Sequence, residues 1–171
     1  SAREALSKTF ETEVDIWLVS SGTAANALGL SILCPSHGGV LCHQEAHIQT
    51  DERGAPEFYT SGGKLILLPG AHARIDLAAL KRRLDFNDPN FVHETPLHVL
   101  SLSNLTENGA AYRPFEIKER AALAREAGLA VHLDGARLAN ALVSTGATPA
   151  EMTWRAGVDV LSFGATKNGG A

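Results

Sequence analysis

Two residues near the carboxyl end of the chain have the types and the placement that cofactor chemistry requires. Asp134 follows an apolar run at 129–133, and Lys167 follows another at 158–162. An acid and a lysine at the ends of two strands suit pyridoxal phosphate (PLP). The carboxylate would keep the ring nitrogen protonated, and the amine would carry the cofactor as a Schiff base. The alternative is a structural role for both, as a buried acid and an ordinary paired lysine.

A second group of residues, at 20–26, fits a phosphate. We expect this segment to join a first strand to a helix, where free backbone N–H groups carry a partial positive charge. Gly22 would let the backbone approach an anion closely, and Ser21 and Thr23 add hydroxyl donors. Neither a G-x-G-x-x-G fingerprint nor a Walker motif is present. The alternative is a tight turn in which Ser21 or Thr23 caps the helix.

A third segment, at 44–52, carries a histidine and an acid. His47 could stack its flat ring on a flat cofactor, and Glu52 could hold a proton or a water molecule nearby. A metal site is an alternative interpretation of this segment, because His43 and His47 are four positions apart on a possible helix. No glutamate directly follows His43 and no third ligand is evident, so we expect no metal here. An ordinary capping or surface histidine is also possible.

Strand-like and helix-like runs alternate along the chain, which predicts an α/β fold around a mostly parallel sheet. Such sheets bind ligands at the carboxyl ends of their strands, where the segment 20–22, Asp134 and the turn at Lys167 would lie. The expected strands are 17–19, 40–42, 65–68, 98–102, 129–133 and 158–162, and the expected helices are 2–9, 23–33, 75–84, 114–127 and one that starts at 148.

Composition narrows the classes of partner. The 171 residues are enough for one domain, and the net charge of −4 offers no basic face for nucleic acid. No apolar run approaches the length of a membrane span, and no secretory leader is evident at the amino end. Cys34 and Cys42 make no disulfide framework, so we expect both to be reduced in a cytoplasmic protein.

Five sequence blocks in a fixed order resemble one family. They are SGT at 21–23, EAH at 45–47, GAPEF at 54–58, LDGAR at 133–137 and SFGATKN at 162–168. Together they are similar to the low-specificity L-threonine aldolases, PLP enzymes of the aspartate-aminotransferase fold. The resemblance implies a three-layer α/β sandwich with a mostly parallel sheet, and it implies PLP as cofactor.

The resemblance also implies a role for each candidate residue. Lys167 would be the covalent anchor of the cofactor and Asp134 the partner of its ring nitrogen. Arg137 would lie near the ring hydroxyl and the substrate carboxylate, with an ordinary salt bridge at a helix start as the alternative. His47, Glu52 or an ordered water would take the proton from the substrate hydroxyl. The remaining cofactor-binding residues implied are Ser21, Gly22 and Thr23, with the loop at 106–107 over the cofactor.

The activity that the resemblance implies is cleavage of L-threonine, L-allo-threonine and related β-hydroxy-α-amino acids to glycine and an aldehyde. It also implies a homodimer or homotetramer. Residues 1–171 would then be an incomplete PLP-binding large domain without its carboxyl-terminal small domain. A β-eliminating lyase or an aminotransferase with the same cofactor is an alternative activity, and a non-catalytic fragment is the alternative of another class.

Overall fold

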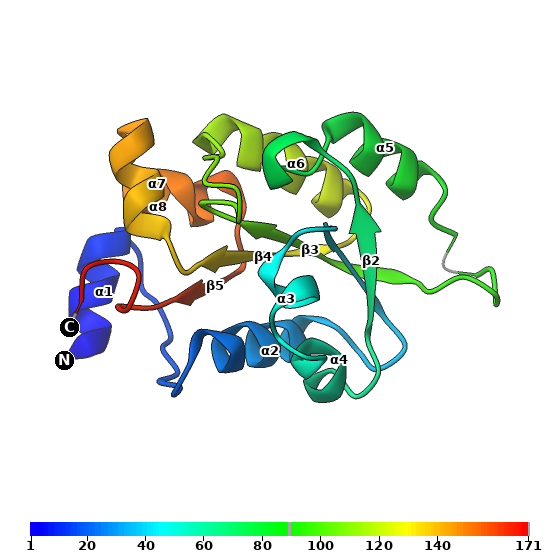
Figure 1. The fold of residues 1–171 in the computed structure, drawn as a ribbon, viewed down its shortest axis with the longest axis horizontal. Coiled ribbons are helices and arrows are strands. Elements are labelled where there is room, and N and C mark those ends of the chain that lie inside the picture. Colours follow the sequence, from blue (N-terminus) through cyan, green and yellow to red (C-terminus); the bar gives the residue numbers. More distant parts are fainter. Residues whose placement is uncertain (89, 171) are drawn as a thin grey trace.

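A parallel β-sheet lies at the centre of the computed structural model, which describes residues 1–88 and 90–170 (Figure 1). The strands lie in the order β2-β1-β3-β4-β5, and every neighbouring pair is parallel. Five of the expected strands are therefore confirmed, with ends that shift by one or two residues. Their bounds are β1 (Gly39–His43), β2 (Lys64–Leu68), β3 (Leu97–Ser103), β4 (Ala130–Gly135) and β5 (Val160–Phe163).

Helices cover both faces of this sheet. In Figure 1, α2 and α4 lie on one side of it, and α5 and α6 lie on the other. The chain is thus a three-layer α/β sandwich, as predicted. The helices are α1 (Ala2–Phe10), α2 (Gly22–Leu33), α3 (His47–Thr50), α4 (Ala55–Tyr59), α5 (Leu77–Asp85), α6 (Pro114–Glu126), α7 (Leu138–Thr145) and α8 (Pro149–Met152), with short 3₁₀ turns at Ala71–Ala73 and Trp154–Ala156.

The central strands are buried on both faces because their side chains point alternately to the two helical layers. Val40 and Val99 pack with Leu30 of α2 in one apolar cluster. Leu41 and Leu100, the next residues along the same two strands, belong to the larger cluster on the opposite face. Burial of this kind fixes the register of the sheet, since a slip of one residue would exchange the two faces.

Strand order determines where a ligand can bind. From β1 the chain crosses to β2 on one side and then to β3 on the other, so the connections diverge at the carboxyl ends of β1 and β3. Ligands of open α/β sheets bind in the crevice that such a reversal creates. In the same edge, Asp134 of β4 is in register with Ser103 of β3 and Ser162 of β5.

Local signals explain most of the helix boundaries. The Asp76 side chain accepts a hydrogen bond from the Ala79 N–H, so α5 begins at Leu77 rather than at the expected position 75. Thr148 and Glu151 form a reciprocal capping box at the start of α8, as the predicted threonine cap requires.

The expected strand at 17–19 is wrong. Residues 13–19 have no regular secondary structure, and Leu18 is 87% exposed, with Trp17 and Val19 also exposed. A β-prone run forms a strand only where a neighbouring strand offers its hydrogen-bonding groups, and none of the described strands pairs with this segment. The start of α2 is therefore reached from a loop and not from a strand.

Across residues 1–88 and 90–170, no helix combines the length and the apolar character that crossing a membrane demands.

Candidate active site

Asp134 lies at the end of β4, where its buried carboxylate is held from two sides. Its Oδ1 accepts a hydrogen bond from the backbone N–H of Ala136 at 3.0 Å. Its Oδ2 accepts one from the side-chain Nδ2 of Asn26 at 3.0 Å. The second contact joins β4 to α2, which are 108 positions apart in the chain. An acid fixed in this way keeps one orientation and presents it at the carboxyl edge of the sheet.

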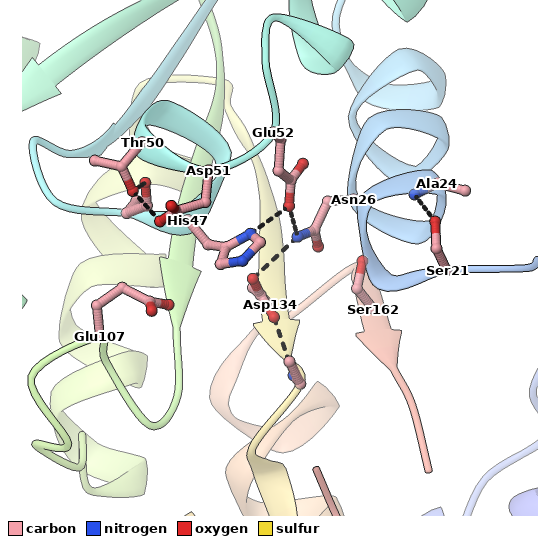
Figure 2. Close-up of polar contacts among 12 residues, drawn as sticks. Ser21, Ala24, Asn26, His47, Thr50, Asp51, Glu52, Glu107, Asp134 and Ser162 are labelled. Carbon is pink, nitrogen blue, oxygen red and sulfur yellow. Dashed lines mark hydrogen bonds and ion pairs between the residues drawn. The ribbon is translucent and has the colours of Figure 1, made fainter. Parts of the chain in front are cut away.

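His47 and Glu52 form a pair beside Asp134 (Figure 2). His47 Nδ1 and Glu52 Oε1 are 2.8 Å apart, and the same oxygen accepts a hydrogen bond from Asn26 Nδ2 at 2.8 Å. The side chain of His47 is 26% exposed, whereas that of Glu52 has no exposed surface. Burial raises the pKa of Glu52, while its hydrogen bonds from Asn26 and His47 act in the opposite direction.

The start of α2 has the form of an anion site. The Ser21 side chain accepts a hydrogen bond from the Ala24 N–H at 3.1 Å, so the capping reading of Ser21 is confirmed. For the backbone N–H groups of Gly22 and Thr23, no acceptor is found among the residues that the structure describes. A β-carbon added at Gly22 would meet no atom within 4 Å, so the helix start is open beside Gly22.

Arg137 binds a glutamate of the loop after β3. Its Nη1 and Nη2 donate to the two carboxylate oxygens of Glu107 at 3.0 and 3.2 Å. This two-fold contact raises the pKa of Arg137. Arg137 therefore forms a salt bridge, as the alternative interpretation of the sequence expected, and its partner Glu107 lies in the loop after β3. The loop is itself fixed, because the Thr106 hydroxyl donates to the His72 carbonyl and Asn108 Nδ2 donates to Glu45.

Lys167 lies in an exposed turn after β5. Asn168 attaches this turn to the start of α7 and to the end of β4, since its Oδ1 accepts from the Ala139 N–H at 2.8 Å and its Nδ2 donates to the Gly135 carbonyl at 3.5 Å. Within the described chain, the Lys167 amine has no hydrogen bond or ion pair with Asp134 or His47. The structure thus brings the lysine turn to the sheet edge without joining its side chain to the acid and histidine cluster.

Sequence reasoning missed Asn26. The available signal was its spacing, because a residue four positions after Gly22 lies on the same face of α2, one helical turn further on. An asparagine inside an Ala/Leu-rich helix is also unusual, since burial of its amide requires partners.

A buried hydrogen-bonded chain under the site was missed as well. His132 of β4 is fully buried and lies between two serine hydroxyls, with Nδ1 at 2.9 Å from Ser101 and Nε2 at 3.0 Å from Ser162. Burial lowers the pKa of His132 well below its usual range. The three side chains link β3, β4 and β5 directly behind Asp134.

The pairing of His43 with His47 as metal ligands has no geometric basis. His43 is in β1, and its ring nitrogens contact the Gly70 carbonyl at 3.0 Å and the Glu45 N–H at 3.1 Å. Over residues 1–88 and 90–170, no group of three or more histidine, cysteine, aspartate or glutamate side chains is arranged to hold a metal ion.

Known proteins with similar sequences include several threonine aldolases. The chain is 44% identical over 163 residues to the low specificity L-threonine aldolase of Pseudomonas sp. (strain NCIMB 10558), which covers 95% of this chain and 46% of that protein. It is 43% identical over 164 residues to the enzyme of the same name from Pseudomonas aeruginosa, with 94% and 46% covered. The chain therefore spans about half the length of these relatives.

The fold agrees with the solved structure of a threonine aldolase. A threonine aldolase from Leishmania major superposes with a TM-score of 0.89 at 31% identity, covering 99% of this chain and 48% of that one. The sequence also matches the family described as beta-eliminating lyase, and the match runs from residue 1 to residue 171. With strands, helices and site residues all inside that match, the chain belongs to the beta-eliminating lyase family.

Proposed function

We propose that this chain forms the cofactor-binding part of a PLP-dependent aldehyde-lyase. Its substrates would be L-threonine, L-allo-threonine and related β-hydroxy-α-amino acids, which it would cleave to glycine and an aldehyde. The observation that carries the proposal is the cluster of Asp134, Asn26, Glu52 and His47 at the sheet edge next to the open start of α2. The similarity to threonine aldolases supports the choice of reaction.

The described residues fit PLP on chemical grounds. Asp134 is a buried carboxylate with a fixed orientation, which is the group needed to keep a pyridine nitrogen protonated. The unpaired N–H groups of Gly22 and Thr23 would hold the phosphate, and Lys167 would be the covalent anchor. Ser21 already caps α2, so its hydroxyl would be a weaker phosphate ligand. When bound, PLP draws electrons from the bonds at the substrate α-carbon.

The proton of the substrate hydroxyl must be removed for the carbon–carbon bond to break, and we assign this step to His47. A charged carboxylate only accepts hydrogen bonds, so Glu52 fixes the Nδ1–H tautomer of His47 and leaves Nε2 with its lone pair. Glu52 has no exposed surface and lies behind His47, which is partly exposed. Glu52 therefore orients the base, and His47 also covers one side of the cofactor.

Arg137 would bind the carboxylate of the amino acid. Its planar guanidinium can donate to two carboxylate oxygens at once, and those donors are now directed at Glu107. Substrate would then share or displace Glu107. The partners of this protein would be the small-molecule amino acid and further copies of the same chain, in a homodimer or homotetramer. Exposed apolar side chains on α2 and α4, among them Ile32 and Phe58, support such an assembly.

The assembly is open to direct measurement on the full-length polypeptide that contains this chain. Sedimentation velocity should give a mass of two or four copies, and a monomer at micromolar concentration would contradict the homo-oligomer. We place the protein in the cytoplasm, in keeping with Cys34 and Cys42, which are buried free cysteines.

The test of the reaction is turnover of L-threonine by the full-length polypeptide with added PLP. Acetaldehyde should form together with an equal amount of glycine, as measured by reduction of the aldehyde with a coupled dehydrogenase. Transfer of the amino group to a 2-oxo acid would instead favour an aminotransferase. Release of ammonia and a 2-oxo acid would favour β-elimination, the alternative that the family description supports. Retention of PLP with no turnover would favour a non-catalytic protein.

A further inference from the structure

Asn26 is the junction between the two buried acids of the site (Figure 2). It lies on α2 one turn after Gly22 and is 3% exposed. Its amide nitrogen carries two hydrogens, and each is donated to a different carboxylate: Glu52 Oε1 at 2.8 Å and Asp134 Oδ2 at 3.0 Å. Both donors of this one amide are therefore used inside the site.

Glu52 and Asp134 share one amide nitrogen, and the nearby charge of Asp134 opposes the ionisation of Glu52. The charge of Asp134 adds to burial in raising the pKa of Glu52, and the hydrogen bond from Asn26 acts against both. Glu52 Oε1 accepts from Asn26 and contacts His47, while its Oε2 is buried with no partner in the described part of the chain. The negative charge of Glu52 is therefore stabilised by the contacts at Oε1 alone among the described residues.

The proposed function needs both acids charged at the same time. Asp134 must be charged to hold a proton on the ring nitrogen, and Glu52 must be charged to accept the Nδ1 proton of His47. A protonated Glu52 could keep its proton and donate a hydrogen bond to Nδ1, which would favour the tautomer protonated at Nε2 and leave no lone pair there. Loss of the charge on Asp134 would leave the ring nitrogen without its partner, and loss of the charge on Glu52 would leave His47 unable to act as a base.

We propose that Asn26 is a positioning residue that keeps Glu52 and Asp134 charged side by side. His47 could then act as the base in the same site in which Asp134 holds a proton on the ring nitrogen of PLP. The inference rests on the proposed function for its consequence in catalysis. Its physical content concerns only residues of this chain. The Gly22 N–H group and the Asn26 amide lie on successive turns of one helix, so α2 would hold the phosphate and align both acids together.

The alternative is that Asn26 only ties α2 to the sheet. That task is already met by apolar packing, since Ala27 and Leu30 of α2 are fully buried against the strands. A purely structural amide would change stability when removed. It would leave the ionisation of Glu52 and the pH dependence of turnover as they are.

The test is a titration of Glu52 in the cofactor-free full-length polypeptide. Glutamate labelled with carbon-13 at the carboxyl carbon is followed by NMR, and the signal is assigned by its loss in Glu52→Gln. In Asn26→Ala the midpoint should move to higher pH by roughly one unit, an ordinary perturbation for a carboxyl group in a folded protein. Ser31→Ala is the matched control, because it removes a polar group of α2 that contacts only the Leu28 carbonyl.

A second readout follows the consequence for the site. In Asn26→Ala the acidic limb of the pH profile for kcat/KM should move upward with the Glu52 midpoint, and the dissociation constant for PLP should rise about tenfold, equivalent to ~1.4 kcal/mol. Asn26→Ser keeps one donor and should give a smaller shift of the same sign. It also serves if the alanine variant does not fold, as judged by circular dichroism.

The proposal is overturned if a folded Asn26 variant titrates Glu52 at the same pH as the unmodified protein. The Glu52 measurement uses neither PLP nor substrate, so its outcome is independent of the reaction. Failure of the unmodified protein to cleave threonine would contradict the proposed function and leave the linkage between the two acids to be judged by the titration alone.

Discussion

At the scale of single residues, the site is defined by groups that are already oriented before any ligand binds. Arg137 is held by both oxygens of Glu107, and Asp134 is held from two sides. Preorganised charges of this kind do not have to reorient during a reaction, which is a main source of electrostatic catalysis. The cost is that each charge has a competing partner inside the protein, as Glu107 competes with a substrate carboxylate.

A lysine in place of Arg137 should impair recognition of the amino acid. Lysine is a point charge and cannot bind two carboxylate oxygens in a plane. Hydrogen bonds to charged groups contribute about 1.5–3 kcal/mol, so kcat/KM for threonine should fall about 10- to 100-fold in Arg137→Lys, mostly through KM. Steady-state kinetics measure this.

The matched control for that change is Arg155→Lys, which alters an arginine paired with Glu11 at 2.9 Å on the outer surface. Its kinetics should equal those of the unmodified protein. An unchanged kcat/KM in Arg137→Lys would remove Arg137 from substrate binding.

At the scale of elements, a methyl group added at Gly22 should leave the stability of α2 intact and should weaken the binding of PLP. The added carbon meets no protein atom within 4 Å, and alanine is a better helix former than glycine by up to about 1 kcal/mol. We expect Gly22→Ala to keep or raise the melting temperature of the cofactor-free protein. Its dissociation constant for PLP, from an absorbance titration, should rise at least about tenfold. Equal affinity for PLP would contradict the phosphate assignment.

Across the sheet, the Ser101–His132–Ser162 chain predicts a pH dependence of stability. Burial lowers the pKa of His132, so below the ordinary histidine value near 6.5 the unfolded chain takes up a proton that the folded chain does not. The free energy of unfolding therefore falls as pH falls. This single group should account for about 1.4 kcal/mol between about pH 7.5 and about pH 5.5.

Urea unfolding at the two pH values measures the effect. In His132→Asn this part of the pH dependence should disappear. The exposed His93 supplies the control, since His93→Asn should leave the difference unchanged. A loss of stability on acidification that is identical in His132→Asn would mean that other groups cause it.

At the scale of the whole molecule, the architecture could be predicted because strands that are buried on both faces appear in the sequence as short apolar runs. The runs around Val40, Leu100 and Val131 are apolar on both sides of the sheet, and only a parallel sheet covered by two helical layers buries both. Trp17–Val19 has the same local composition, yet it is exposed. Whether such a run finds a neighbouring strand depends on the rest of the fold, which local pattern does not report.

The site was predictable to a similar degree. The charged candidates could be named because each follows an apolar run whose end lies at one edge of the sheet. Asn26 and His132 could not be found in that way, since they act inside α2 and β4 and their partners are far away in the chain. Their roles follow from contacts between elements, which exist only once the layers have packed.

Lys167 is the residue on which the assignment of a PLP site depends most directly, and it is exposed in the turn that Asn168 fixes to the end of β4. The decisive measurement is incubation of the full-length polypeptide with PLP, reduction with borohydride and mapping of the modified peptide by mass spectrometry. We predict a pyridoxyl group on Lys167 and none in Lys167→Ala. An unmodified Lys167, or a label confined to another lysine, would contradict the assignment of this sheet edge as a PLP site.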